Sequence, residues 1–367
     1  MQRILVLCTL LFCTSLSGCL STLEQAVDEE CSFENKSTNS DTLRILSYDI
    51  LAFDSEMIEA FEAEFGYEIE FIYENDAGGI LNQMMLTKNI PQADLAIGLD
   101  NTYIQTAIEF CLLQPHNLVV EEIQSHLSSP YDSYGIPFDY GYVCLNLDTG
   151  RLHENESAPT SLSDLTNERW ANTIAIPSPL TSSPGRAFFL ATLKNFDYDM
   201  SKTFDWWTSM KNNGVIVTSG WTEAYETHYS GGYGVWTEGH IGDAAMTVSY
   251  CHSPGVEAFF NFNETKSTSI LYNETSFKQI EYATMIKGTA NSAGAKEFIT
   301  FLLSHEVNSD MPTSNYMYSV LENTSLPTEH GYAWHSSTPS SNSTFDDSML
   351  TQSTDELLLQ WSEIMMS

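Results

Sequence analysis

The fold is set by a series of alternating apolar patterns that begins with residues 43–48, Leu43-Arg44-Ile45-Leu46-Ser47-Tyr48, which predict a short strand. Apolar and polar residues then alternate over Glu68–Tyr73, and Ala93–Leu99 is a continuous apolar run, so two further strands are predicted. Between the strands, apolar residues recur at helical spacing after Ser55 and after Gly79. This order of elements predicts a parallel, right-handed, doubly wound α/β unit.

Polar residues follow each of the three predicted strands. These strand ends carry Tyr48-Asp49, the segment Asn75-Asp76-Ala77-Gly78-Gly79, and Asp100-Asn101. In doubly wound sheets, ligands bind beyond the carboxyl ends of the strands, so these residues are candidates for a binding site. Asp and Asn are also good helix caps, and that alternative stays open for each of them. The glycine pair would let an anion such as phosphate approach the N-terminus of the next helix.

A second unit of the same kind is expected in the middle of the chain. A strand at Thr173–Ile176 precedes a loop rich in Ser, Thr and Pro, and a helix starts at about Arg186. The strand Tyr282–Ile286 and the helix Ala293–Ser304 are expected to return to the first unit. The sequence therefore predicts two doubly wound lobes joined by a hinge, with a ligand cleft between them. The expected boundaries are 43–140 with 282–367 for the first lobe, and 141–281 for the second.

The N-terminus has the pattern of an export signal. Residues 1–18 contain an apolar run, Ile4–Phe12, that is too short to span a bilayer. The run leads to Leu16-Ser17-Gly18-Cys19, which resembles the lipobox of prokaryotic lipoproteins. We therefore expect lipidated Cys19 to anchor the chain to the outer face of the cell membrane, with residues 19–42 as a flexible tether. The alternative is an ordinary cleaved signal with a chance cysteine.

The chain is strongly acidic. Its 14 Lys and Arg against 49 Asp and Glu give a formal net charge of −35 over 367 residues. Nucleic-acid binding is excluded because it needs Lys and Arg, and the 12% of aromatic residues excludes an acidic disordered chain. We expect an exported monomer. Asn-X-Ser/Thr sequons suit a surface glycoprotein, and they begin at Asn35, Asn155, Asn263, Asn273, Asn323 and Asn342.

Motifs that indicate catalysis or a cofactor are missing from the sequence. There is no G-x-S-x-G, H-E-x-x-H, Walker A or G-x-G-x-x-G pattern. The nine His show no tight metal spacing and the Cys form no C-x-x-C, so we expect no enzyme, no metal and no cofactor. Cys111 and Cys144 are one candidate disulfide, but the pairing among Cys31, Cys111, Cys144 and Cys251 stays open.

Aromatic residues gather between residues 221 and 250, with carboxylates interleaved among them. The rings are Trp221, Tyr225, Tyr229, Tyr233, Trp236 and Tyr250, and the carboxylates are Glu223, Glu226 and Glu238. Some of these rings will belong to the core, and for Trp221 both roles are open. Aromatic faces beside carboxylates suit a flat organic cation, which gains ~0.5–2 kcal/mol over a ring.

Several segments, in order over residues 43–330, resemble the thiamine-binding proteins of ABC importers, which have the type II solute-binding fold. The specific ones are Ile136-Pro137-Phe138-Asp139-Tyr140-Gly141-Tyr142 and Gly220-Trp221-Thr222-Glu223-Ala224-Tyr225. The others are Ser47–Asp49, Ala93–Asn101, Thr181–Gly185, Val248–Tyr250 with Ser253-Pro254, and Met311–Tyr318. The resemblance implies a two-lobed receptor that closes over thiamine or a thiamine phosphate and then docks on an ABC permease.

The resemblance also implies which residues bind the ligand. Asp76 and Ala77 would lie at a helix start on the phosphate side, with Ser182 facing them from the second lobe. Tyr48 and Tyr316 would stack on the ligand from the first lobe. The other positions that match the family's motifs would line the wall of the second lobe, and they are Trp221, Tyr250, Cys251, His252 and Ser253.

The sequence departs from the family at two rings. The segment Leu51–Asp54 lacks the expected Trp, and Val256 stands where a Tyr is expected. Tyr229, Tyr233 or Trp236 are candidates to replace the missing rings. A receptor of the same fold for ferric iron or a polyamine is the alternative function, and a secreted enzyme or adhesin is a further one.

Overall fold

The computed structural model describes residues 31, 40–48, 55–120, 122–229, 241–340 and 353–367. The chain divides into two units, residues 1–34 and 35–367. Cys31 is the one described residue of the first unit, and all other described residues belong to the second. The expected signal at 1–18, the lipid site at Cys19 and the tether before Ser40, apart from Cys31, lie outside the described residues. Within the described ranges, no helix has both the length and the apolar character that crossing a membrane requires.

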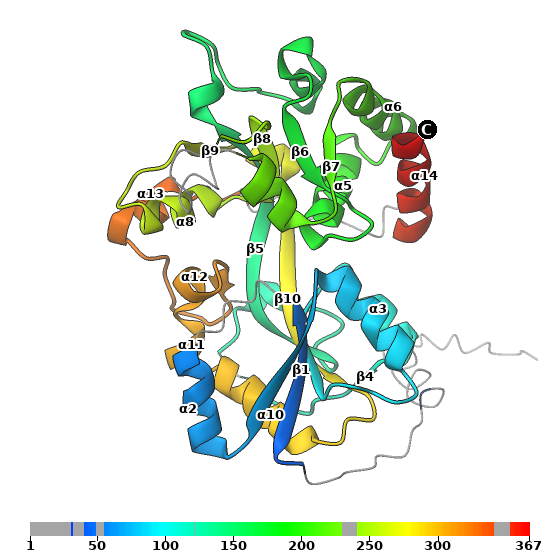
Figure 1. Ribbon diagram of the computed structural model, residues 1–367, viewed down its shortest axis with the longest axis vertical. Coiled ribbons are helices and arrows are strands. Elements are labelled where there is room, and N and C mark those ends of the chain that lie inside the picture. Colours follow the sequence, from blue (N-terminus) through cyan, green and yellow to red (C-terminus); the bar gives the residue numbers. More distant parts are fainter. Residues whose placement is uncertain (1–30, 32–39, 49–54, 121, 230–240, 341–352) are drawn as a thin grey trace, which may run out of the picture. The chain divides into compact units, whose positions relative to one another are not determined.

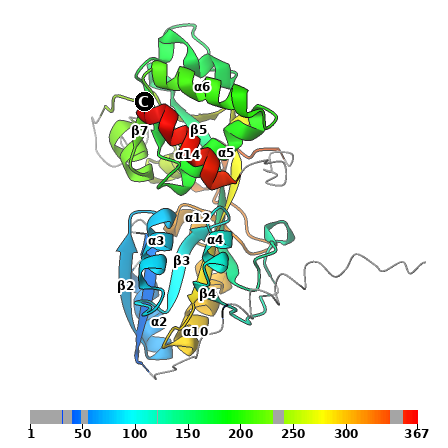
Figure 2. The ribbon, with the colours of Figure 1, turned by 90° about the vertical axis from the view of Figure 1, so that its right-hand side faces the viewer.

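The first lobe is built on three parallel strands, as the sequence predicts. β1 (Thr42–Tyr48) pairs in parallel with β2 (Glu68–Glu74) on one side and with β3 (Leu95–Asp100) on the other. Helices α2 (Ser55–Phe65) and α3 (Ala77–Thr87) connect these strands (Figure 2). The remaining elements of this lobe are α4 (Ile104–Glu109), β4 (Leu113–Gln114), α10 (Ser292–Leu302), α11 (His305–Asn308), α12 (Met311–Ser314) and β11 (Tyr318–Ser319).

Two long antiparallel strands run from the first lobe into the second. They are β5 (Gly135–Asp148) and β10 (Phe277–Ile286), and both are visible in Figure 1 between the two groups of helices. Phe138 of β5 is buried in the core of the first lobe, whereas Val143 of the same strand is buried in the core of the second. The expected boundaries at 140/141 and 281/282 therefore fall inside continuous strands, which form the hinge.

The second lobe repeats the doubly wound arrangement. The sheet continues from β5 to β8 (Met246–Tyr250), then to β6 (Ile174–Pro177) and β7 (Ile216–Thr218), and the last three strands are mutually parallel. The strand β6 matches the expected strand Thr173–Ile176 to within one residue. The lobe also contains α5 (Ser183–Asn195), α6 (Met200–Asn212), a π-helix (Glu223–His228), α8 (Ser253–Phe260), β9 (Ser267–Ile270), α9 (Tyr272–Thr275) and α13 (Tyr332–His335).

The C-terminal helix α14 (Thr354–Met366) belongs to the second lobe, so its expected place in the first lobe is wrong. Leu357, Leu358 and Trp361 are buried in the core of the second lobe, and α14 lies beside α6 in Figures 1 and 2. The Trp361 ring meets the Trp207 ring edge to face, with 5.6 Å between centroids. Leu357, Leu358 and Trp361 form the apolar face of α14, and this face packs against α6. The matching apolar surface on α6 therefore determines that α14 joins the second lobe.

A disulfide joins Cys144 of β5 to Cys251, which follows β8. The candidate pair Cys111–Cys144 is therefore wrong. Cys144 lies on β5 and Cys251 directly follows the neighbouring antiparallel strand β8, in which Tyr250 is opposite Val143, and the two Cα atoms lie 4.9 Å apart. A disulfide requires a Cα separation of roughly 4.4–6.8 Å, and pairing of the strands provides it. The bond closes a loop of 107 residues and ties the hinge strand to the wall of the second lobe.

Candidate functional site

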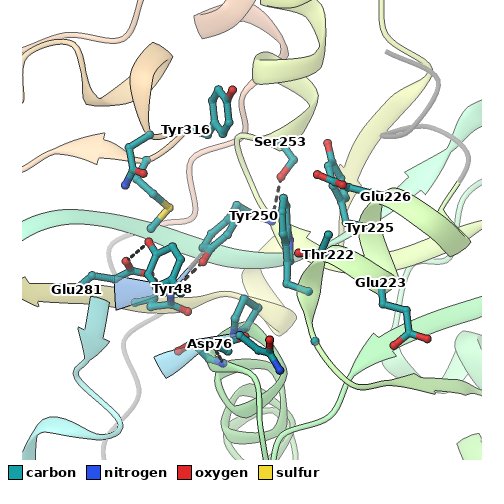
Figure 3. A pocket seen from close by; sticks show the side chains of 18 of the residues that line it. Tyr48, Asp76, Thr222, Glu223, Tyr225, Glu226, Tyr250, Ser253, Glu281 and Tyr316 are labelled. Atoms are coloured by element: carbon teal, nitrogen blue, oxygen red, sulfur yellow. Dashed lines mark hydrogen bonds between the residues drawn. The ribbon is translucent and has the colours of Figure 1, made fainter. Parts of the chain in front are cut away.

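A cavity of about 430 Å³ lies between the two lobes, a volume within the range of small-molecule sites. Side chains reach it from the strand ends of the first lobe, from the loop and π-helix after β7, and from the segment after α12 (Figure 3). The residues that border it are Tyr48, Asn75, Asp76, Ser183, Pro184, Ser219, Gly220, Trp221, Thr222, Glu223, Tyr225, Glu226, Thr227, Tyr250, Ser253, Val256, Gln279, Glu281, Asn315, Tyr316 and Met317.

Asp76 connects the two lobes at one side of the cavity. It is the N-cap of α3, and its Oδ1 accepts a hydrogen bond from the backbone N–H of Ala77 at 2.8 Å. The same oxygen accepts one from the N–H of Ser183, at the start of α5 in the second lobe, at 3.1 Å. Burial raises the pKa of Asp76 to about 6, although these N–H groups favour the ionised form.

The wall of the second lobe is a stack of aromatic rings. Trp221 lies over Tyr225 with 4.8 Å between centroids, and Tyr225 lies over Tyr229 at 5.9 Å. The Trp221 indole N–H donates to Ser249 Oγ at 2.9 Å, which fixes the ring. Tyr229 is fully buried behind Tyr225, so it does not replace a missing ring of the cavity. The other candidates for that role, Tyr233 and Trp236, lie outside the described residues.

A hydrogen-bonded group of four side chains lies at the hinge, between the two walls. The Tyr48 hydroxyl donates to Glu281 Oε2 at 2.6 Å, and the Gln279 amide donates to Glu281 Oε1 at 2.7 Å and to the Tyr250 hydroxyl at 2.9 Å. The Tyr48 ring lies directly against Gly98, whose φ of +101° and missing side chain make room for it. Figure 3 shows Tyr48, Glu281 and Tyr250 together at this point.

Tyr316 borders the cavity in a backbone conformation that is uncommon for a bulky residue, with φ of +58°. His252 Nε2 lies 2.6 Å from the Tyr316 carbonyl oxygen and donates to it, which holds this segment against the second lobe. Burial lowers the pKa of His252 to about 4, so its imidazole is neutral near pH 7. A strained residue at a cavity wall is typical of a binding site.

The structure brings six of the ten expected ligand residues to the cavity and places four behind it. The six are Tyr48, Asp76, Trp221, Tyr250, Ser253 and Tyr316. The four that do not border it are Ala77, Ser182, Cys251 and His252, all of which are buried. The side chain of Cys251 is bonded to Cys144, so it has no free thiol to offer a ligand. Ala77 contributes through its N–H to Asp76.

Sequence reasoning missed Gln279 and Glu281, which lie at the centre of the site. The expected strand started at Tyr282, whereas β10 starts at Phe277 and carries both polar residues into the hinge. A signal was present: Gln279 and Glu281 are two residues apart, so they project to one face of an otherwise largely apolar strand. Val256, which stands where a ring was expected, also borders the cavity.

The model of one protein family, described as bacterial extracellular solute-binding protein, matches residues 56–323. The chain belongs to this family. The thiamine-binding periplasmic protein of Escherichia coli is 27% identical over 293 residues, which are 78% of this chain and 82% of the relative. The protein of the same name from Brucella suis is 27% identical over 287 residues, 76% of this chain and 79% of the relative.

The fold of this solute-binding protein matches that of a solved structure described as a periplasmic thiamin binding protein. The TM-score is 0.74, the identity 22%, and the match covers 91% of this chain and 99% of the other. The expected fold of two doubly wound lobes around a cleft, the type II solute-binding fold, is thus confirmed. Members of this family act outside the cytoplasm as binding proteins. The cavity between the lobes is therefore the candidate site for the bound solute.

Proposed function

We propose that this solute-binding protein is an extracytoplasmic receptor that binds thiamine and delivers it to an ABC permease. The observation that carries the proposal is the pairing of an aromatic wall with carboxylates around one cavity. Trp221 and Tyr225 lie on one side, and Asp76 and the buried Glu281 lie on the other. Thiamine has a permanently cationic thiazolium and a flat aminopyrimidine. Rings stabilise both by stacking, and the carboxylates stabilise the cation.

The proposed function includes no catalysis. Thiamine would enter an open cleft, the lobes would close on it, and it would leave unchanged at the permease. The Asp76–Ser183 hydrogen bond supports closure, because it exists when the N-termini of α3 and α5 approach each other. These N-termini also support binding of a thiamine phosphate at the same side of the cavity, since backbone N–H groups there stabilise anions.

Ferric iron is the alternative ligand within the same fold, and two observations disfavour it. In the described part of the chain, no group of three or more His, Cys, Asp or Glu residues could hold a metal ion. Burial and nearby carboxylates raise the pKa of Tyr48 and of Tyr250 well above the ordinary value, which opposes the deprotonation that iron ligation by tyrosine requires. A polyamine would find carboxylates here, but it has no ring to stack on Trp221.

The proposal extends to the cell surface. We infer a monomer anchored to the outer face of the membrane through lipidated Cys19, with the cleft open to solvent and a permease as its partner. The motif Leu16-Ser17-Gly18-Cys19 supports the anchor. Metabolic labelling with a radioactive fatty acid tests it, because label should appear in the full chain and disappear in Cys19→Ser.

Isothermal titration calorimetry tests the ligand directly. The purified protein is titrated with thiamine, thiamine monophosphate, thiamine diphosphate, spermidine and ferric citrate. We expect submicromolar binding of thiamine with a stoichiometry of one. Absence of heat with thiamine and with both phosphates contradicts the proposal, and tight binding of spermidine or iron alone would assign the cleft to the alternative ligand.

A further inference from the structure

Three carboxyl groups lie in one row across the hinge. Glu281 of β10 pairs with Asp100 of β3 on one side and with Asp139 of β5 on the other. Residues directly opposite one another in neighbouring strands project to the same face, so the three carboxyls share one side of the sheet. All three are buried, with exposed fractions of 0%, 4% and 0% for Asp100, Glu281 and Asp139. The register between β10 and β5 shifts directly after Glu281, and that between β10 and β3 shifts one residue later; such irregularities are common beside functional sites.

The groups that face Glu281 leave its charge uncompensated. From the other elements these are Tyr48 of β1, Asp76 of α3, Asp100 of β3, Asp139 of β5 and Tyr250 of β8. Each is an acid or a phenol. Its own strand adds the neutral amide of Gln279. Among the described residues, no ion pair joins a Lys, Arg or His to any of the three acids in the row.

The positive charge of Arg186, on α5, favours the ionised form of Asp100. Its guanidinium stacks over the Tyr103 ring at 4.5 Å, and Nη2 lies 3.2 Å from Asp355. Asp139 has one neutral partner, Asn315, whose amide donates to Oδ2 at 2.6 Å. Two ionised carboxylates side by side in this buried row would repel each other without a counter-charge.

The row of three carboxyl groups lies where a ligand in the cavity can contact it. Glu281 and Gln279 both border it. Gln279 Oε1 and Asp139 Oδ1 are buried acceptors that have no hydrogen-bond partner in the described part of the chain, and their residues are fully buried. Buried polar atoms without partners are costly and rare, and they are explained when a ligand supplies the missing partner. Burial raises the pKa of Glu281 to about 8, and burial together with Glu281 raises that of Asp139 well above its ordinary value.

We propose that Glu281, with Asp139 beside it, is the proton-exchanging counter-charge of the cleft, which holds a proton while the cleft is empty and releases it when a permanently cationic ligand binds. This inference rests on the proposed function, because the cation it names is the thiazolium of thiamine. The protonated Glu281 carboxyl loses H⁺ to a solvent base, and the carboxylate that remains pairs with the bound cation. The Tyr48 hydroxyl and the Gln279 amide already donate to this carboxyl and stabilise its ionised form.

If this proposal is right, the cleft selects its ligand by charge rather than by shape. A neutral molecule of the same outline cannot replace the proton, so it leaves Glu281 protonated and gains no ion pair. A cation gains the pair at the cost of releasing the proton, and this cost falls as pH rises. Affinity for thiamine should therefore be about tenfold higher near pH 8.5 than near pH 6.5, whereas affinity for a neutral isostere should not change.

Calorimetry in paired buffers tests the proton release. The full protein is titrated with thiamine near pH 7 in phosphate and in Tris, which differ in ionisation enthalpy, and the difference in heat gives the number of protons released. We expect close to one proton with thiamine and none with deazathiamine, in which a carbon replaces the cationic thiazolium nitrogen. Binding of thiamine with no proton release and no pH dependence overturns the inference while the proposed function stands. No binding at all overturns the proposed function.

The variant Glu281→Gln assigns the proton to its residue. It should abolish proton release and flatten the pH profile, leaving affinity near pH 8.5 about tenfold weaker than in the wild type. Glu257→Gln is the matched control, because Glu257 is a buried carboxyl of the second lobe with a raised pKa that does not border the cavity. This control should release the same number of protons as the wild type. Unchanged proton release in Glu281→Gln contradicts the assignment.

A measurement without ligand completes the test. Infrared spectra of the empty protein near pH 7 should contain the C=O stretch of a protonated carboxyl, and this band should be lost or strongly reduced in Glu281→Gln. Addition of thiamine to the wild type should remove it. An empty protein without such a band overturns the inference, whatever the calorimetry of thiamine shows.

Discussion

The Asp76 carboxylate and the backbone N–H of Ser183 are hydrogen-bonded across the cleft at 3.1 Å. Asp76 thereby caps its own helix, α3, and also meets the first residue of α5 in the other lobe. One acceptor serves one N–H at each of two helix N-termini, and the partial positive ends of both helices favour its negative charge. The contact forms when the lobes approach, and it links closure of the cleft to one residue at its edge.

Replacing Asp76 tests this link. Asp76→Ala removes the acceptor for both N–H groups, so we expect α3 to lose about 1 kcal/mol of capping and the closed form to lose its contact with Ser183. Thiamine affinity should fall roughly fivefold to tenfold by calorimetry. Asp76→Asn keeps an acceptor oxygen and should recover the part of that loss that comes from the hydrogen bonds, whereas the part that comes from the negative charge should remain. Equal weakening by both substitutions would mean that charge, and not the hydrogen bond, matters at this position.

Trp221 should contribute to affinity through its ring. Trp221→Ala removes a stacking surface fixed by Tyr225 and Ser249, and we expect binding to weaken by at least ~1 kcal/mol. Trp221→Phe should lose less. Trp334→Ala is the matched control, since Trp334 is 85% exposed and does not border the cavity. A dissociation constant unchanged in Trp221→Ala would remove this ring from the site.

The free energy of unfolding of the empty protein should depend on pH in a way that reflects the raised pKa of Glu281. Its folded pKa of about 8 lies above the ordinary 4.5, so the folded state holds a proton that the unfolded chain has lost over this range. The stabilisation from this group is therefore complete below about pH 4.5 and is lost as pH rises towards 8.

The comparison of wild type with Glu281→Gln isolates this group from the many other carboxylates. In urea unfolding, the free energy of unfolding of the wild type minus that of the variant should fall with rising pH between about 4.5 and 8, with a slope approaching about 1 kcal/mol per pH unit. A difference that stays constant or rises would show that Glu281 is ionised in the empty cleft.

The C-terminal helix should matter for the stability of the second lobe. Trp361→Ala empties a site between α14 and α6 where the ring is 2% exposed, so we expect a loss of about 3–5 kcal/mol in the free energy of unfolding. Leu359→Ala on the same helix, 65% exposed, should change it by less than about 0.5 kcal/mol. Similar small effects from both would place α14 outside the cooperative core.

Local patterns in the sequence predict the strands and the residues at their ends. Tyr48 and Asp76 follow strands whose apolar periodicity is unambiguous, and the carboxyl ends of parallel strands meet at one edge, so their placement at the cavity could be foreseen. The alternative role of Asp76 as a helix cap is also realised, because it caps α3 and borders the cavity at once. Capping and binding are compatible at such an edge.

Long-range relationships could not be predicted in the same way. The pairing of Cys144 with Cys251 depends on β5 and β8 being neighbours, which no local pattern reports. The side on which α14 packs depends on a surface of α6 more than 140 residues away. The acid row combines Asp100, Asp139 and Glu281 through strand register, so each looks like one of many carboxylates until the sheet is assembled.

A crystal structure of the protein grown with thiamine would show whether the cavity is the binding site. We expect one thiamine molecule in the cavity between the lobes, with a ring against Trp221 and the thiazolium facing the side of Glu281. The contradicting result is a map from thiamine-saturated crystals in which the cavity holds no ligand, or holds it away from both Trp221 and Glu281.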